Sequence, residues 1–199
     1  MSYKSIPCSN KILLLFIVLL ALGCGSNEDI VDNTNGDNQT TAKNNVLLII
    51  ADDLGLDATA GYNIGNQKPI MPTLQKLINS GIKFNNVWSN PVCTPTRGTI
   101  LTGKYGYRTS VLKVDDVLST SEVSIFKHLK NNTNYESAFI GKWHLSGKPS
   151  DRNHPNNMGI DYYSGILGGG VSDYFNWTLS KNGQNSNVNQ YITSVFTDE

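Results

Sequence analysis

Three apolar runs along the chain predict buried strands. Residues 45–51 are almost continuously apolar and partly β-branched, as in a strand covered on both faces of a parallel sheet. Residues 82–88 and 135–141 predict two further strands. Because helical segments alternate with these runs, the pattern indicates an α/β fold with a parallel sheet.

Segments with a helical pattern separate the apolar runs. Residues 71–81 have an early proline, Pro72, and finish at Gly81, which are signals for the first turn and the end of a helix. A second helix is expected over residues 96–103. A third, over residues 121–130, turns its apolar side chains to one face and has serines before it that can cap its start.

Beyond residue 146 the pattern weakens. This part is rich in Gly, Asn and Tyr, with weak strand signals near 174–179 and 189–195 and what resembles the start of a helix at 197–199. The glycines at 168–170 are interpreted as a flexible loop, with a close backbone approach to a substrate as the alternative.

Residues 1–24 have the pattern of an export signal and are not counted as part of the fold. Lys4 and Lys11 precede the apolar run 12–22, which is shorter than the about 20 residues that a membrane-spanning helix needs. The run ends close to a bacterial lipobox, so we expect lipid on Cys24; an ordinary secretory signal is the alternative. The prediction is an exported, membrane-anchored lipoprotein that faces the periplasm or the outer cell surface.

The next segment, residues 25–44, is rich in Asn, Asp, Thr and Gly, which predicts a flexible linker. Residues 45–199 are long enough for one domain. The chain has 16 basic and 16 acidic residues, and loss of the signal would leave 14 and 16, a net charge of −2. With no basic run and no RNA- or DNA-binding motif, nucleic acid is not an expected partner.

The three cysteines do not indicate a disulfide. Cys8 would leave with the signal and Cys24 would carry lipid, so no pair remains in a compartment that permits disulfides. Cys93 therefore needs a different explanation, either as an inert buried thiol or as a reactive group.

Several polar residues follow the predicted strands or begin helices. Asp52 and Asp53 come directly after the first strand, where α/β sheets bind ligands, and paired carboxylates suit a hard divalent cation; a plain polar turn is the alternative. Cys93 precedes a helix start, where backbone amides favour anions, and Arg97 offers a guanidinium for an oxyanion.

Lys142 and His144 lie two residues apart on an extended segment and would point the same way. A lone histidine is more often structural than catalytic. Lys104 and Arg108 could steer anions or belong to a solvated helix face, and His128 is expected at the surface. His154 is not assigned a catalytic role.

Residues 93–103 resemble the signature of type I sulfatases, C-x-P-[STA]-R-x-x-x-L-T-G. Residues 46–53 are similar to the family's first strand with its aspartates, and residues 140–144 to its second signature, with Asn134 where a glycine is usual. The resemblance implies an alkaline-phosphatase-like α/β fold, a mostly parallel sheet flanked by helices. Residues 45–199 would be the N-terminal part of the catalytic domain, truncated at the C-terminal side.

The resemblance also implies a site. Cys93 would be oxidised to formylglycine, whose hydrate attacks a sulfate ester. Arg97 and Lys142 would contact the sulfate, and His144 would orient or deprotonate the hydrate.

A metal site is part of the same implication. Asp52, Asp53 and the side chain at Cys93 would bind Ca²⁺, with Mg²⁺ as the alternative. The family's later ligands, an Asp and an Asn or His, are not identified before Glu199.

The function expected is hydrolysis of sulfate esters, with sulfated polysaccharides or other carbohydrate sulfates favoured over small aryl sulfates. The implied partners are a formylglycine-generating maturation enzyme and, through lipid on Cys24, a membrane. Two alternatives stay open: a phosphonate or phosphate ester hydrolase of the same superfamily, and an inactive truncated lipoprotein.

Overall fold

The computed structural model describes residues 44–199, so the predicted signal, Cys24 and all but the end of the predicted linker lie outside the described residues. Every helix and strand below belongs to one compact unit, Ile50–Glu199. No helix in the described part is long and apolar enough to cross a membrane.

Two of the three predicted strands are not found. Residues 45–51 and 82–88 form no strand, and their apolar side chains are exposed, by 84 % for Val46 and 92 % for Trp88. A strand needs hydrogen-bonded neighbours to satisfy its backbone and a second layer to cover its side chains. Neither run pairs with another strand in the described part of the chain, so both strand predictions are wrong for this structure.

The predicted helices are found with shifted starts. Helix α2 (Pro72–Ser80) matches the first prediction, and α3 (Cys93–Thr102) begins three residues earlier than expected. Helix α5 (Ile125–Asn132) begins later, because Ser124 is its N-cap and its Oγ accepts from Lys127 N at 3.1 Å. The short helices α4 (Gly106–Thr109) and α6 (His154–Asn157) were not predicted. Helix α7 (Ile192–Asp198) covers most of the stretch 189–195, so the weak strand signal there is wrong, and the predicted helix start at 197–199 lies at its end.

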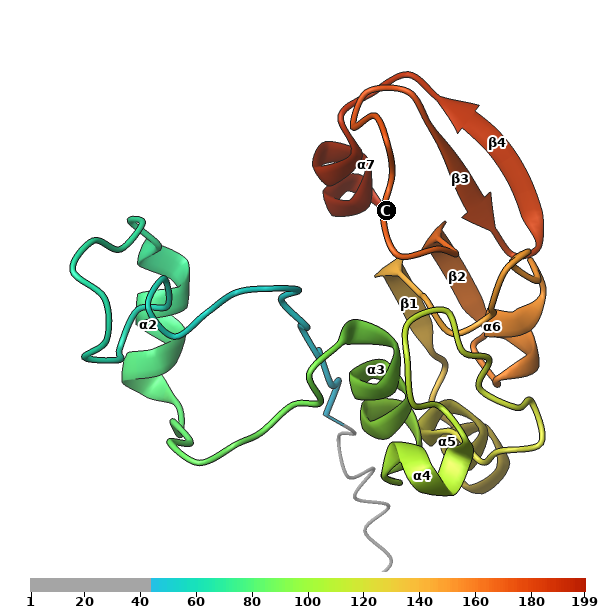
Figure 1. The fold of residues 1–199 in the computed structure, drawn as a ribbon, viewed down its shortest axis with the longest axis horizontal. Coiled ribbons are helices and arrows are strands. Elements are labelled where there is room, and N and C mark those ends of the chain that lie inside the picture. Colours follow the sequence, from blue (N-terminus) through green and yellow to red (C-terminus); the bar gives the residue numbers. More distant parts are fainter. Residues whose placement is uncertain (1–43) are drawn as a thin grey trace, which may run out of the picture. The chain divides into compact units, whose positions relative to one another are not determined.

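Four strands form one mixed sheet in the order β1-β2-β3-β4 (Figure 1). They are β1 (Ala138–Lys142), β2 (Tyr162–Ile166), β3 (Trp177–Lys181) and β4 (Gln184–Val188). The pair β1–β2 is parallel, whereas β2–β3 and β3–β4 are antiparallel. The α/β class is confirmed, but the expected predominance of parallel pairing is not found among the described strands.

The last two strands form a hairpin that was not predicted: the weak strand signal at 174–179 overlaps β3, but no signal covers β4. Asn182 and Gly183 connect β3 to β4, and both have positive φ angles, 44° and 78°. An Asn-Gly pair with this geometry is the preferred two-residue turn because its twist matches that of the strands. The dipeptide was therefore a stronger signal here than hydrophobic alternation.

The main core lies between the helices α3 and α5 and the strands β1 and β2. Leu101 of α3 and Tyr163 of β2 are buried in it, and Phe126 of α5 and Phe139 of β1 pack against it. Trp143, directly after β1, is fully buried and meets Phe139 edge to face, with ring centroids 5.2 Å apart. This aromatic packing stabilises the C-terminal end of β1, where the predicted site residues Lys142 and His144 lie. A second, smaller cluster joins Ile166, Trp177, Leu179 and Ile192.

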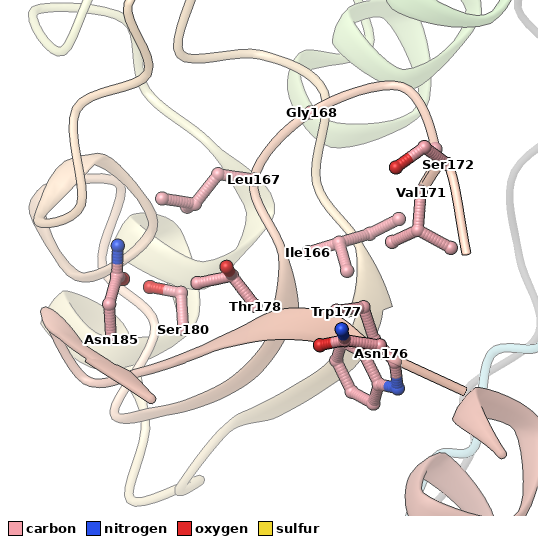
Figure 2. A pocket seen from close by; sticks show the side chains of 11 residues that line it. Ile166, Leu167, Gly168, Val171, Ser172, Asn176, Trp177, Thr178, Ser180 and Asn185 are labelled. Atoms are coloured by element: carbon pink, nitrogen blue, oxygen red, sulfur yellow. The ribbon is translucent and has the colours of Figure 1, made fainter. Parts of the chain in front are cut away.

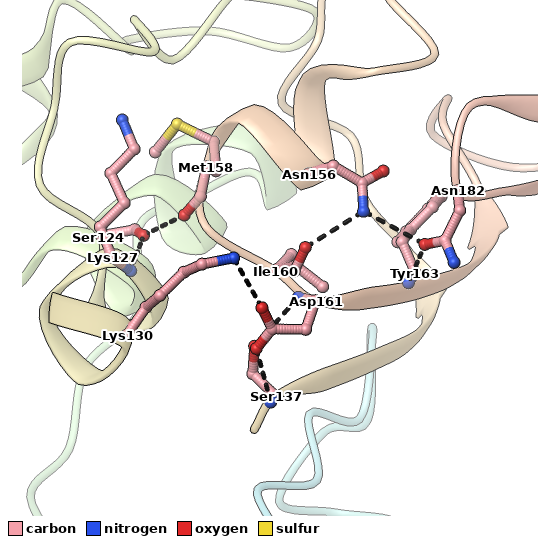
Figure 3. A network of polar contacts seen from close by, with 10 residues as sticks. All are labelled: Ser124, Lys127, Lys130, Ser137, Asn156, Met158, Ile160, Asp161, Tyr163 and Asn182. Carbon is pink, nitrogen blue, oxygen red and sulfur yellow. Dashed lines mark hydrogen bonds and ion pairs between the residues drawn. The ribbon is translucent and has the colours of Figure 1, made fainter. Parts of the chain in front are cut away.

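A polar network holds the other ends of the same strands (Figure 3). Asp161, just before β2, accepts from Lys130 Nζ of α5 at 2.7 Å and from Ser137 Oγ, just before β1, at 2.9 Å. Ser124 Oγ donates to Met158 O. These contacts tie α5 and the starts of β1 and β2 together, which supports the register Ala138 opposite Tyr162.

Candidate active site

Cys93 is the first residue of α3. The preceding residue, Val92, is extended, with φ −136° and ψ 160°, and no side chain caps this end of the helix. The first amides of a helix have no partner inside it, so they make this end electropositive. Cys93 is a free, half-buried thiol at that position.

His144 is the side chain in contact with Cys93. Its Nδ1 lies 3.2 Å from Cys93 Sγ, although the two residues are 51 positions apart. His144 has a positive φ of 57°, and its backbone N–H donates to Leu167 O at 3.0 Å. The histidine is 5 % exposed. The structure thus brings together two of the predicted catalytic residues.

Arg97 connects α3 to the end of β1. It lies one turn after Cys93, is nearly buried, and donates through Nη1 to Lys142 O. Its Nη2 lies 3.5 Å from Asp52 Oδ2. A buried guanidinium needs such partners because its desolvation is costly.

Lys142 and Asp52 form the shortest ion pair of the site, with Nζ 2.5 Å from Oδ2. Burial by itself would raise the pKa of Asp52, but Lys142 and Arg97 outweigh it and hold that pKa below its ordinary value. The carboxylate is therefore ionised at neutral pH. The predicted sulfate-binding lysine and a predicted metal ligand are direct neighbours.

The side chains of Asp52 and Asp53 are of the donor type that a hard cation prefers. Asp52 and Asp53 are adjacent and exposed, and Asp53 has a positive φ of 57°. Carboxylate oxygens are preferred Ca²⁺ ligands, but Ca²⁺ takes six to eight of them. Among residues 44–199 no group of three or more His, Cys, Asp or Glu side chains could hold a metal ion. These residues would supply part of a metal shell.

Asp115 also reaches the site, and the sequence analysis missed it. Its Oδ1 lies 2.9 Å from His144 Nε2, and its Oδ2 lies 2.7 Å from Lys148 Nζ. The hydrogen bonds from Lys148 and then His144 lower the pKa of Asp115. No spacing rule links positions 115 and 144. The only available signal was the acidic pair Asp115 and Asp116, in the segment after the signature at residues 93–103.

The triple glycine packs against His144, a predicted catalytic residue. A Cβ atom at Gly169 would lie 2.6 Å from His144 Cε1 and 2.9 Å from Nε2, so only glycine allows this approach to the ring. The neighbouring positions, Gly168 and Gly170, have open space around them. The backbone at Gly169 thus approaches the His144 ring closely. Neither interpretation of the run, a flexible loop or an approach to substrate, includes this contact.

The same glycine loop borders a cavity of about 350 Å³ (Figure 2). Its walls combine apolar and polar side chains from β2, β3, β4 and the loop between β2 and β3, among them Ile166, Leu167, Val171, Trp177, Thr178 and Asn185. Gly168 and Gly170 line it, whereas Gly169 lies against His144. The loop therefore has the cavity as one neighbour and the histidine as another.

His154 and His128 lie outside this group of contacts. Trp143 Nε1 donates to His154 Nδ1 at 3.1 Å, and His154 Nε2 donates to Leu118 O at 2.7 Å. Both ring nitrogens of this buried histidine are therefore hydrogen-bonded inside the core. His128 is exposed, as expected. Lys104 pairs with Glu122 at 2.5 Å, which favours the solvated-face interpretation.

A profile of the family described as "Sulfatase" matches residues 44–199. The chain belongs to the Sulfatase family. Two of its curated relatives illustrate the similarity. Human steryl-sulfatase is 30 % identical over 146 residues, which is 65 % of this chain and 24 % of that protein. An N-acetylglucosamine-6-O-sulfatase of Bacteroides thetaiotaomicron is 29 % identical over 170 residues, 83 % of this chain and 28 % of that protein.

A solved structure is similar to the structure of this sulfatase. It is described as a complex with its substrate, D-glucosamine-2-N,6-O-disulfate, and aligns with a TM-score of 0.61 and 28 % identity over 74 % of this chain and 28 % of the other. The alkaline-phosphatase-like fold expected from the motifs is confirmed. The chain spans about a quarter of the length of these relatives.

Proposed function

We propose that this sulfatase hydrolyses sulfate esters with formylglycine formed from Cys93. The observation that carries the proposal is the 3.2 Å contact of Cys93 Sγ with His144 Nδ1 at the electropositive start of α3. Arg97, on the same helix, and Lys142 bring two cationic groups to the same site.

Residue 93 suits this modification. The thiol is free and half-buried, and one ring nitrogen of a histidine lies at hydrogen-bonding distance. As a hydrate, formylglycine would supply an oxygen that bonds to sulfur while the ester S–O bond breaks and the alcohol leaves with a proton taken up at its oxygen. The second hydroxyl would then lose a proton as sulfate leaves and the aldehyde re-forms.

The chain's own residues have separate roles in this reaction. His144 Nδ1 accepts the hydroxyl proton at residue 93, as a general base does. The Lys142 ammonium and the Arg97 guanidinium bind sulfate oxygens and stabilise the charge that develops on them. Each of the three side chains already has a partner in the structure, so little reorganisation is needed. Arg97 donates to Lys142 O, Lys142 pairs with Asp52, and His144 lies between Cys93 and Asp115.

Ca²⁺ would bind to Asp52, Asp53 and the oxygen of residue 93, with Mg²⁺ as the alternative. It would add positive charge beside the sulfate. The adjacent carboxylates support this assignment, and the low pKa of Asp52 keeps its ligand oxygens unprotonated.

The proposed substrates are sulfated carbohydrates. The support is that two relatives have names or titles that specify sulfated glucosamines, an N-acetylglucosamine-6-O-sulfatase and a complex with D-glucosamine-2-N,6-O-disulfate. We further propose export through residues 1–24, lipid on Cys24 and a periplasmic or outer-surface location. Maturation would require a formylglycine-generating enzyme.

The test measures both the modification of residue 93 and the rate of ester hydrolysis. It uses the complete gene product, expressed in a host that has the maturation enzyme. Mass spectrometry of the tryptic peptide that contains residue 93 should show the aldehyde or its hydrate. The protein should hydrolyse an aryl sulfate and a sulfated glucosamine faster than an aryl phosphate, and Cys93→Ala should have no activity.

Each contrary result identifies a different failure. An unmodified thiol at residue 93 in active protein excludes the formylglycine mechanism. Preference for the aryl phosphate supports the phosphate or phosphonate hydrolase instead. Matured protein without activity on any of these esters supports the inactive lipoprotein.

A further inference from the structure

We propose that Asp115 is the positioning residue for His144: its carboxylate accepts the Nε2 proton and keeps Nδ1 available as the proton acceptor at residue 93. The consequence for catalysis rests on the proposed sulfatase function. The hydrogen-bonded arrangement itself does not.

The geometry places the histidine between two partners. Asp115 Oδ1 lies 2.9 Å from Nε2 on one side of the ring, and Cys93 Sγ lies 3.2 Å from Nδ1 on the other. A neutral imidazole has one nitrogen that donates and one that accepts. An ionised carboxylate can only accept, so the nitrogen next to Asp115 must carry the hydrogen, and Nδ1 presents its lone pair to residue 93.

Asp115 is itself held in place by two further contacts. Lys148 Nζ lies 2.7 Å from Oδ2, which leaves Oδ1 for the histidine. The backbone N–H of Asp115 donates to Thr94 Oγ1 at 3.3 Å, and Thr94 is fully buried on α3 next to Cys93. The backbone of Asp115 is thus tied to the helix that begins with Cys93.

The backbone of Asp115 is in the left-handed region, with φ 65°, which is uncommon for a residue with a side chain. The lowered pKa of Asp115 keeps it ionised at neutral pH, as an acceptor must be. The neighbouring carboxylate, Asp116, makes different contacts, because its Oδ2 accepts from Leu112 N at 2.8 Å and from Lys113 N at 2.9 Å.

Gly169 limits the ring from another side. The position of its missing Cβ is 2.6 Å from His144 Cε1 and 3.1 Å from Nδ1. A methyl group there would displace the imidazole from its two partners. Asp115 and Gly169 therefore act on the same ring, one through a hydrogen bond and one through close packing.

Asp115→Asn tests the hydrogen bond, with Asp116→Asn as the matched control in the same loop. Both variants keep the side-chain shape and remove one charge. In the matured, complete gene product we expect Asp115→Asn to lower kcat by roughly 10²–10⁴-fold, the range for a lost general acid–base contribution, with KM nearly unchanged. Asp116→Asn should keep kcat within about threefold, as surface changes usually do.

A double variant separates positioning from a general structural role. If Asp115 acts through His144, Asp115→Asn combined with His144→Ala should be no slower than His144→Ala alone. Gly169→Ala should also lower kcat, whereas Gly168→Ala, with open space around it, should not. Additive losses in the double variant, or equal losses in Asp115→Asn and Asp116→Asn, overturn the proposal.

A spectroscopic measurement does not depend on activity. In ¹⁵N spectra of histidine-labelled protein, with His144 assigned by comparison with His144→Gln, the ring should show a protonated Nε2 and an unprotonated Nδ1. Asp115→Asn should change that pattern. A protonated Nδ1 in the wild type refutes the positioning role even in an active enzyme. Inactive wild-type protein with the expected tautomer contradicts the sulfatase function and leaves the arrangement of Asp115 and His144 standing.

Discussion

Lys142 Nζ donates to Asp52 Oδ2 at 2.5 Å, although the two residues lie 90 positions apart in the sequence. One of them is the proposed sulfate-binding cation and the other a proposed metal ligand. A metal at Asp52 and a sulfate at Lys142 would therefore be adjacent, and a change at either residue should affect both binding events.

Asp52→Asn should weaken Ca²⁺ binding, and excess metal should restore part of the lost activity. The amide keeps one oxygen ligand but loses the charge that attracts the cation. We expect the Ca²⁺ concentration for half-maximal activity to rise by at least about tenfold, on the scale of one lost charge-assisted contact. Titration of chelator-treated enzyme measures it. Asp53→Asn is the matched comparison, because Asp53 does not pair with Lys142; if neither variant changes the Ca²⁺ requirement, the metal assignment is wrong.

Lys142→Ala should raise KM and lower kcat for sulfate esters. Its charge meets the sulfate in the ground state and in the transition state, so both parameters lose stabilisation. A charged hydrogen bond contributes about 1.5–3 kcal/mol, which corresponds to roughly 10- to 150-fold in kcat/KM. Steady-state kinetics with a sulfated sugar would show it. Retention of the wild-type KM would mean that Lys142 serves only to pair with Asp52.

Gly165→Ala should destabilise the fold by about 3 kcal/mol, at the upper end of the range for overpacking. Gly165 on β2 pairs with Gly141 on β1, and a Cβ there would lie 1.8 Å from Gly141 O. The strands would have to separate just before Lys142. Equilibrium unfolding measures the effect, and Gly168→Ala should change the unfolding free energy by less than about 0.5 kcal/mol. Equal stability of the two variants would contradict the close strand contact.

Acidification should destabilise the protein through His154. Burial lowers the pKa of this histidine below its ordinary 6.5, so between the folded and unfolded pKa values the unfolded chain binds more protons. Stability is then fully present above about pH 6.5 and declines as the pH falls through the folded pKa. The free energy of unfolding, measured with urea at pH about 7 and about 5, should fall less between these two pH values in His154→Gln than in the wild type. The lower limit is chosen because the pKa values of Asp115 and Asp161 lie below their ordinary 3.8, so these carboxyl groups titrate only at more acidic pH. An unchanged decrease in the variant would assign the acid sensitivity to other groups.

Most residues of the proposed site could be predicted from the sequence because the signatures that contain them are short and local. The run from Cys93 to Arg97 contains its own helix start, and one turn of α3 suffices to place both side chains at the same end. Lys142 and His144 are predicted from the resemblance to the second signature and from their two-residue spacing on an extended segment. The resemblance, and not periodicity alone, supplies their proposed roles.

Other features depended on partners that no local pattern reveals. The run at 45–51 has strand composition, yet strand formation requires a neighbour and none pairs with it in the described residues. The hairpin at Asn182 and Gly183 was not predicted, because β4 has no alternation of apolar and polar residues; the Asn-Gly pair was the available signal.

By itself the sequence determined the family and the identities of the predicted nucleophile, cations and carboxylates, because signatures record side-chain types at fixed spacing. Only the tertiary structure decided which groups touch. Asp115 reaches His144 across 29 positions, and Gly169 packs on the same ring from the loop after β2. Such contacts arise from the folding of distant loops onto one strand end. Their energies come from distances and burial, which the linear order of residues does not specify.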